Sequence, residues 1–113
     1  MLVIMDNLSP PVEAARLPVR GGLHTLIDED LQPYLSRFRW FLLKSAHNKY
    51  VATRRIRNGK AHTVRLHRLI TRAPASMKVH HINHNPLDNR RSNLLLVTER
   101  EHRHFDGWHI FRK

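Results

Sequence analysis

The sequence contains no cysteine and few acidic residues, and each of these features excludes a class of protein. Without cysteine the chain can form no disulfide and no thiolate metal site, which fits a reducing compartment and leads us to expect a cytoplasmic protein. Nine Asp and Glu stand against twenty Lys and Arg, and the net charge of +11 at pH 7 predicts an anionic partner, with nucleic acid as the first candidate. No apolar run approaches the roughly 18 residues of a membrane span. Residues 1–5 are too short, and lack the basic flank, to form a secretory signal, so we expect no membrane partner.

The length and the distribution of charge indicate one domain whose functional surface lies in its second half. A chain of 113 residues with 41% hydrophobic and 26% charged residues is typical of a single folded domain. Residues 1–53 carry a net charge of +1, whereas residues 54–113 hold fourteen basic and four acidic residues, a net charge of +10. Six of the ten histidines also fall in the last 34 residues.

Local patterns predict a strand-rich α+β domain. The Asn58-Gly59 pair is a strong hairpin signal. Asp28 is expected to cap a short helix over 28–36, and Thr98 with Glu101 forms a capping box that opens a helix over 98–105. A further helix is expected over 66–72. The expected strands cover residues 23–27, 39–44, 49–56, 61–66, 79–82 and 93–97.

Proline and the order of these elements suggest how the domain is organised. Residues 1–20 carry three prolines and little periodicity, and we interpret them as an N-terminal arm or an extended edge segment. Residues 21–75 form a small β-rich part with a short helix at its end. Residues 76–113 read as a strand, a loop, a strand and a helix. We expect all three parts to make one compact domain.

This last unit contains three polar residues, one on each of its expected elements. His81 lies on its first strand, Asn93 opens the second strand 12 residues later, and His102 follows on the helix after another 9 residues. The rings of His80 and His81 should point to opposite faces of an extended strand. A helix packed across the hairpin would bring one of them near His102, and a pair of neutral imidazoles can bind a divalent metal.

These residues belong to segments that resemble the HNH endonucleases. The segments are Leu-His-Arg-Leu-Ile at 66–70, Val-His-His-Ile-Asn at 79–83, Asn-Pro-Leu-Asp-Asn-Arg-Arg-Ser-Asn-Leu at 85–94 and Thr-Glu-Arg-Glu-His at 98–102. The likeness is greatest to the small phage and intron-encoded type, also called the ββα-metal or His-Me finger, and covers roughly a third of the chain. Residues 23–65 resemble, more loosely, the β-rich segment often found ahead of such motifs. The resemblance implies that residues 76–113 form the finger.

The resemblance also implies a role for each matching residue. His81 would be the general base that takes a proton from water, and Asn93 would hold the loop and the backbone of His81. His80, at a position that is most often Asp in the family, and His102 would bind a single divalent cation. Mg²⁺ or Mn²⁺ is the first expectation, with Ni²⁺ or Zn²⁺ as alternatives because His replaces a hard carboxylate. The expected products are a 5′-phosphate and a 3′-hydroxyl.

The neighbouring residues receive simpler interpretations. Asp88 and Asn89 are read as turn-forming, and His67 as a structural residue that packs its helix on the finger. Trp40 is expected in the core of the β-rich part. Basic residues that could contact the phosphates of double-stranded DNA are Arg54, Arg55, Arg57, Lys60, Arg65, Arg68, Arg90 and Arg91.

Three hypotheses of different classes remain open. The first is a metal-dependent endonuclease that nicks DNA or cuts both strands, whose sequence specificity is either low or supplied by a homodimer or an accessory protein. The second is a DNA-binding module whose finger is degenerate and does not cleave, for which His80 is the hint. The third is a structural zinc site made by His80, His84, His102 and His104, against which the absence of cysteine counts.

Overall fold

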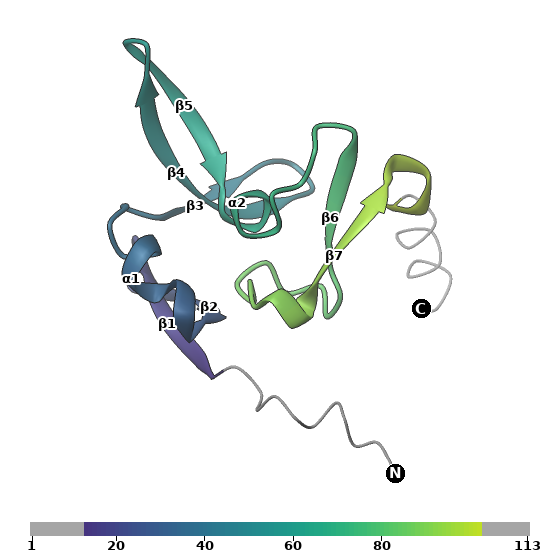
Figure 1. Ribbon diagram of the computed structural model, residues 1–113, viewed down its shortest axis with the longest axis horizontal. Helices are drawn as coiled ribbons and strands as arrows, with labels where there is room; N and C mark the ends of the chain where they lie inside the picture. The colour runs from purple at the N-terminus through teal and green to yellow at the C-terminus, as the bar shows by residue number, and fades with distance from the viewer. Residues whose placement is uncertain (1–12, 103–113) are drawn as a thin grey trace.

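The computed structural model describes residues 13–102, which form a small, strand-rich fold with few helices (Figure 1). Strands β1 (Ala14–Val19) and β2 (Leu23–Asp28) form an antiparallel hairpin. Gly21 and Gly22 connect them at φ of 89° and 79°, a region that favours glycine. Residues 14–19 were expected in an arm or edge segment. They form a strand with two buried side chains, because Leu17 and Val19 point into the core. The expected arm before residue 13 lies outside the described residues.

The helix expected over 28–36 is replaced by two shorter pieces. A 3₁₀ turn, η2 (Glu29–Leu31), leads into α1 (Gln32–Leu35), which has Pro33 in its first turn. The expected cap is wrong, because the Asp28 side chain makes no capping hydrogen bond. Its carboxylate instead accepts hydrogen bonds from the backbone N–H and the guanidinium of Arg91 at 3.0 and 3.2 Å. A charge-assisted bond to a residue distant in sequence outweighs the local cap.

The second sheet contains the predicted hairpin and ends in a helix. Strands β3 (Phe41–Lys44), β4 (Lys49–Arg57) and β5 (Lys60–Arg65) pair in that order, all antiparallel. Asn58 and Gly59 turn the chain at positive φ of 52° and 77°, as the Asn-Gly signal predicted. The β4–β5 hairpin projects from the body (Figure 1). Helix α2 (Leu66–Thr71) follows β5 without a gap.

The last part of the described chain is a hairpin followed by helical residues. Strands β6 (Met77–His81) and β7 (Leu94–Thr98) pair antiparallel, and a long loop with the 3₁₀ turn η3 (Arg91–Asn93) joins them. Residues 99–102 are helical. The capping box is confirmed, since Thr98 and Glu101 exchange hydrogen bonds of 2.8 and 3.1 Å. The rest of the expected helix, and His104, lie outside the described residues.

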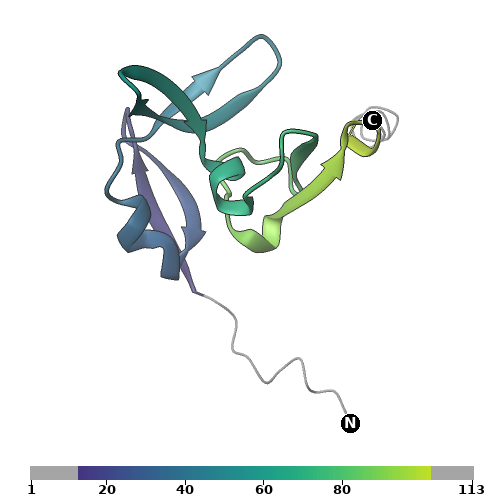
Figure 2. The same ribbon diagram turned by 45° about the horizontal axis from the view of Figure 1, so that its top comes forward.

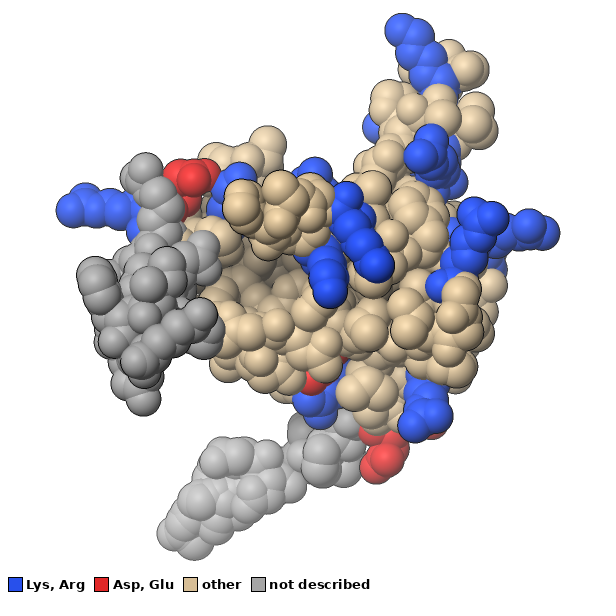
Figure 3. All heavy atoms as spheres, turned by 180° about the vertical axis from the view of Figure 1, so that it is seen from behind, with Lys and Arg blue, Asp and Glu red and all other residues tan. Residues whose placement is uncertain are grey.

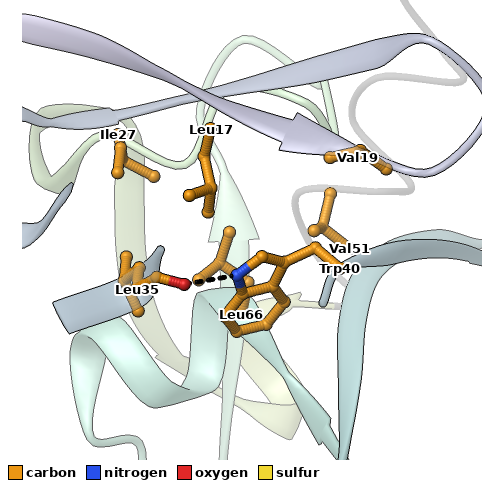
Figure 4. Packing of buried hydrophobic residues seen from close by; sticks show 7 residues of the cluster. All are labelled: Leu17, Val19, Ile27, Leu35, Trp40, Val51 and Leu66. Carbon is orange, nitrogen blue, oxygen red and sulfur yellow. Dashed lines mark hydrogen bonds between the residues drawn. The ribbon is translucent and has the colours of Figure 1, made fainter. Parts of the chain in front are cut away.

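The hydrophobic core joins the N-terminal elements to α2 (Figure 4). Trp40 is buried as expected, and its indole N–H donates to the carbonyl oxygen of Leu35 at 2.9 Å. Leu69 and Ile70 of α2 pack against the cluster from outside. Helix α2 thereby lies between the β1–β2 and β6–β7 hairpins (Figure 2). The buried cluster consists of Leu17, Val19, Ile27, Leu35, Trp40, Val51 and Leu66.

A direct contact also ties β2 to the loop between β6 and β7. The backbone N–H of Leu26 donates to the carbonyl of Leu87, and that of Asn89 donates to the carbonyl of Leu26, both at 2.8 Å. The pairing is a parallel bridge between Leu26 and Asp88. The loop is therefore held from outside its own hairpin. Within residues 13–102, no helix has the length and hydropathy needed to cross a membrane.

Candidate active site

Strand β6 presents two adjacent histidines to different surroundings. The ring of His81 stacks on that of His67, with centroids 5.4 Å apart and planes at 16°, and its Nε2 lies 2.9 Å from Oδ1 of Asn89. The ring of His80 meets the rings of His84 and His102 edge to face, at centroid distances of 5.2 and 6.1 Å. The two rings face different neighbours, as expected for consecutive residues of a strand. His80 and His102, expected to act together, are neighbours.

The surroundings of His81 hold its ring in the neutral form. Burial lowers the pKa of His81, an effect that the hydrogen bond with Asn89 and the carboxylate of Asp88 partly offset. His67 is only 6% exposed, and its pKa falls to about 3, chiefly through burial and then through the electrostatic cost of a positive charge beside His81, Arg65 and Arg68. An uncharged ring thus lies against His81 at neutral pH.

The ring of His67 has a second aromatic neighbour. Tyr50 of β4 lies against it, with ring centroids 5.4 Å apart and planes at 41°. The guanidinium of Arg65 lies 4.7 Å from the centroid of the Tyr50 ring, a cation–π contact. The structural role expected for His67 describes this packing between α2, β4 and β6, although the sequence did not indicate its contact with His81.

Asn93 braces the loop that follows His81. Its Oδ1 accepts the backbone N–H of Asn83 at 3.0 Å, and its Nδ2 donates to Oδ1 of Asn83 and to the carbonyl of Asp88, both at 2.9 Å. Its own carbonyl accepts the N–H of Ile82 at 2.8 Å. These bonds begin one residue after His81, so Asn93 fixes the loop next to that histidine.

Asp88 and Asn89 are both buried. Arg90 binds Asp88 with Nε at 2.7 Å and Nη2 at 2.6 Å, and this ion pair lowers the pKa of the carboxyl group. The amide nitrogen of Asn89 donates to Oγ1 of Thr25 at 2.8 Å and to the carbonyl of Pro86 at 3.0 Å. Of the observed contacts of Asn89, only the hydrogen bond to Pro86 corresponds to the turn-forming role that we expected. The loop conformation brings its amide to His81, a contact that residue spacing does not reveal.

The structure places a cleft over these histidines. The cleft has a volume of about 830 Å³ and reaches from the β3–β4 turn, at Ser45 to Lys49, across Arg65 to β6. His80, His81, His84 and His102 line it. Within residues 13–102 no group of three or more His, Asp or Glu residues could hold a metal ion. The described part of the chain therefore offers no support for a structural zinc site at His80, His84 and His102.

The eight basic residues singled out from the sequence divide into two groups. Arg68 donates to the carbonyls of Ala73, Pro74 and Met77, Arg90 pairs with Asp88, and Arg91 pairs with Asp28 and Asp30. These three side chains hold the fold together, a role that sequence reasoning missed. The other five are exposed on strands β4 and β5, and Lys and Arg side chains stand out along the projecting hairpin (Figure 3). They are Arg54, Arg55, Arg57, Lys60 and Arg65.

Comparison with known proteins agrees with the residues that form this site. Residues 64–104 match a family described as HNH endonuclease, which confirms the resemblance for that segment. The segment includes α2, both strands of the β6–β7 hairpin and every histidine of the cleft except His47. No curated protein and no solved structure matches the chain.

Proposed function

The chain carries an HNH endonuclease segment at residues 64–104, and from this premise we propose that it is a metal-dependent endonuclease that hydrolyses phosphodiester bonds of DNA. The observation that carries the proposal is the placement of His81. Its ring is neutral, braced by His67 and Asn89, and lines one cleft together with His80 and His102. A neutral, oriented imidazole next to two potential metal ligands is what general-base hydrolysis of a phosphodiester requires.

The hydrogen bond to Asn89 indicates which nitrogen of His81 acts as the base. The amide nitrogen of Asn89 donates to Thr25 and Pro86, so the oxygen of that amide faces His81 and must accept a hydrogen. His81 therefore carries its proton on Nε2 and has its lone pair on Nδ1. In the proposed step, Nδ1 takes a proton from water, the water oxygen bonds to phosphorus, the bond between phosphorus and the 3′ oxygen breaks, and this leaving oxygen takes up a proton from solvent water. A 5′-phosphate and a 3′-hydroxyl result.

Two side chains fit the role of metal ligands. His80, 8% exposed, and the half-buried His102 approach each other on the cleft side of the hairpin. Two neutral nitrogen ligands favour Mn²⁺, Ni²⁺ or Zn²⁺ over Mg²⁺, which prefers oxygen ligands. Because these ligands carry no negative charge, the full positive charge of the ion would be available to attract an anionic phosphate. Such an ion, when bound, would neutralise the charge that develops on the phosphoryl oxygens and the leaving oxygen.

The exposed basic residues supply the proposed DNA contacts. Arg54 and Arg55 lie over Phe41 and Phe38, at 5.7 and 5.2 Å from the ring centroids, which restrains both side chains. Arg57 and Lys60 are paired at the end of the β4–β5 hairpin. A two-stranded ribbon of this kind fits the major groove of B-DNA, and its cations would bind phosphates. Arg65, which lines the cleft, would join this surface to the site of cleavage.

A plasmid-cleavage assay tests the proposal. Purified protein is incubated with supercoiled plasmid and Mg²⁺, Mn²⁺, Ni²⁺ or Zn²⁺, with EDTA as a chelator control. We expect metal-dependent nicking or linearisation, lowered about 100-fold or more in His81→Ala, since general-base catalysis contributes at least that much. His24→Ala is the matched control, because His24 is exposed on β2 and is not among the residues of the cleft.

Two results would contradict the mechanism. Full activity of His81→Ala would exclude His81 as the base. Absence of cleavage with every metal, while the plasmid still shifts on a gel, would favour a DNA-binding module that does not cleave. Two observations favour this alternative: His80 stands in place of the usual Asp, and no group of three or more His, Asp or Glu side chains within residues 13–102 could hold a metal ion.

A further inference from the structure

A chain of directed hydrogen bonds runs from the N-terminal hairpin to the proposed base. Oγ1 of Thr25, on β2, donates to the carbonyl oxygen of Leu87 at 2.8 Å. The same oxygen accepts Nδ2 of Asn89 at 2.8 Å, and Oδ1 of Asn89 lies 2.9 Å from Nε2 of His81. Thr25 and Asn89 are 0% and 1% exposed. Water therefore cannot replace these partners in the folded protein.

The donors and acceptors along these hydrogen bonds follow from the chemistry of the groups, beginning with the carbonyl of Leu87. A backbone carbonyl can only accept, so the single hydrogen of the Thr25 hydroxyl must point at Leu87. The Thr25 oxygen is then limited to accepting, and the amide of Asn89 must present its nitrogen there. If that amide were reversed, its oxygen would face the Thr25 oxygen and the carbonyl of Pro86, which are both acceptors. Buried acceptors placed against each other destabilise the fold.

We infer that Thr25 is a positioning residue, which holds the amide of Asn89 in one orientation and thereby keeps His81 in the Nε2–H tautomer. The inference rests on the proposed function for its catalytic consequence, since only this tautomer leaves Nδ1 as the base. Thr25 precedes the matched segment 64–104 by almost forty residues. A strand outside the HNH segment thus contributes to the geometry of its site.

The substitution Thr25→Val tests this inference with little other change. Valine keeps the shape of the side chain and removes the hydroxyl. The carbonyl of Leu87 retains its bond from the N–H of Leu26, and Nδ2 of Asn89 retains the carbonyl of Pro86, so the fold should survive. Thr53→Val is the matched control, because Thr53 is also buried and donates its hydroxyl to a backbone carbonyl, that of Arg39.

The first measurement is the tautomer of His81 in the metal-free protein. Long-range ¹H–¹⁵N NMR of histidine-labelled protein distinguishes the two ring nitrogens, and His81→Gln assigns the signals. We expect only the Nε2–H form in the wild type and in Thr53→Val, a measurable Nδ1–H fraction in Thr25→Val, and recovery of the wild-type signal in Thr25→Ser. A stability loss alone would affect Thr25→Val and Thr53→Val alike.

The second measurement is the cleavage rate. Thr25→Val should lower kcat about three- to tenfold, the value of one net hydrogen bond, with KM unchanged, and Thr25→Ser should restore it. A wild-type tautomer and kcat in Thr25→Val would overturn the inference. If the wild-type protein does not cleave DNA at all, the proposed function is overturned, whereas the NMR result still decides the role of Thr25.

Discussion

The buried His67 should make the protein sensitive to mild acid. The ring contacts both Tyr50 and His81, with Arg65 and Arg68 close enough to oppose a further positive charge. In the unfolded chain its pKa returns to about 6.5. Because the pKa in the folded protein is about 3, protons bind the unfolded state preferentially as the pH falls below 6.5. Stability is therefore complete above that pH and is lost progressively toward pH 3.

The size of the effect follows from linkage. Each pH unit between the two pKa values costs about 1.4 kcal/mol of unfolding free energy, so the 1.5 units from pH 6.5 to pH 5 cost about 2 kcal/mol. Any folded-state pKa well below 5 gives nearly the same loss at pH 5. His81, whose pKa burial also lowers, adds to the loss in the same direction.

Urea denaturation at pH 7 and pH 5, followed by tryptophan fluorescence, measures this loss. The matched variant is His67→Phe, which keeps an aromatic ring in contact with Tyr50 and His81 but cannot take up a proton. We expect the wild type to lose about 2 kcal/mol more than this variant between the two pH values. An equal loss in both proteins would refute the assignment of His67 as a neutral, buried ring.

Two further substitutions test the basic surface and the interaction of β2 with the loop. Arg57→Gln should reduce the slope of log K for duplex DNA against log salt by about 0.9, as expected for one lost phosphate contact, whereas Arg37→Gln, on the α1 side, should leave the slope unchanged. Fluorescence anisotropy with a labelled duplex at several NaCl concentrations measures both slopes. An unchanged slope for Arg57→Gln would show that Arg57 is not part of the DNA interface. Asp28→Ala should lower the unfolding free energy by about 1–3 kcal/mol, because it leaves the backbone N–H of Arg91 without its acceptor. Asp30→Ala, which removes an exposed partner of the same arginine, should cost clearly less in the same urea titration, and the reverse order would contradict the contact.

Features set by neighbouring residues could be predicted from the sequence. The Asn58-Gly59 turn follows from backbone conformations that few residue pairs adopt, and the Thr98 to Glu101 capping box follows from spacing within one helical turn. The histidines of β6 face different sides because strand residues alternate. The HNH resemblance supplied the central residues of the candidate site, and the family match over residues 64–104 confirms the segment.

Features set by distant residues could not be predicted. Asp28 was a reasonable helix cap, yet its partner is Arg91, which lies 63 residues further along the chain. Arg68 looks like any other basic residue until the carbonyls of Met77 and Pro74 are placed around its guanidinium. The same limit applies to Asn89, whose amide meets Thr25 and His81 only in the folded loop. Each of these polar groups has several potential partners of similar chemistry, and only the tertiary fold selects among them.

The pairing of β2 with the loop before β7 also has a kinetic consequence. It joins residues 62 positions apart, and the entropy of closing so long a loop must be overcome before these contacts can form. Local hairpins such as β4–β5 can form early, but the loop that orients the amide of Asn89 is fixed only when the N-terminal strand meets a segment near the other end of the described chain. A ribosome must therefore release most of the polypeptide before the geometry around His81 can exist, and a fragment that begins at residue 64 would fold, if at all, without it.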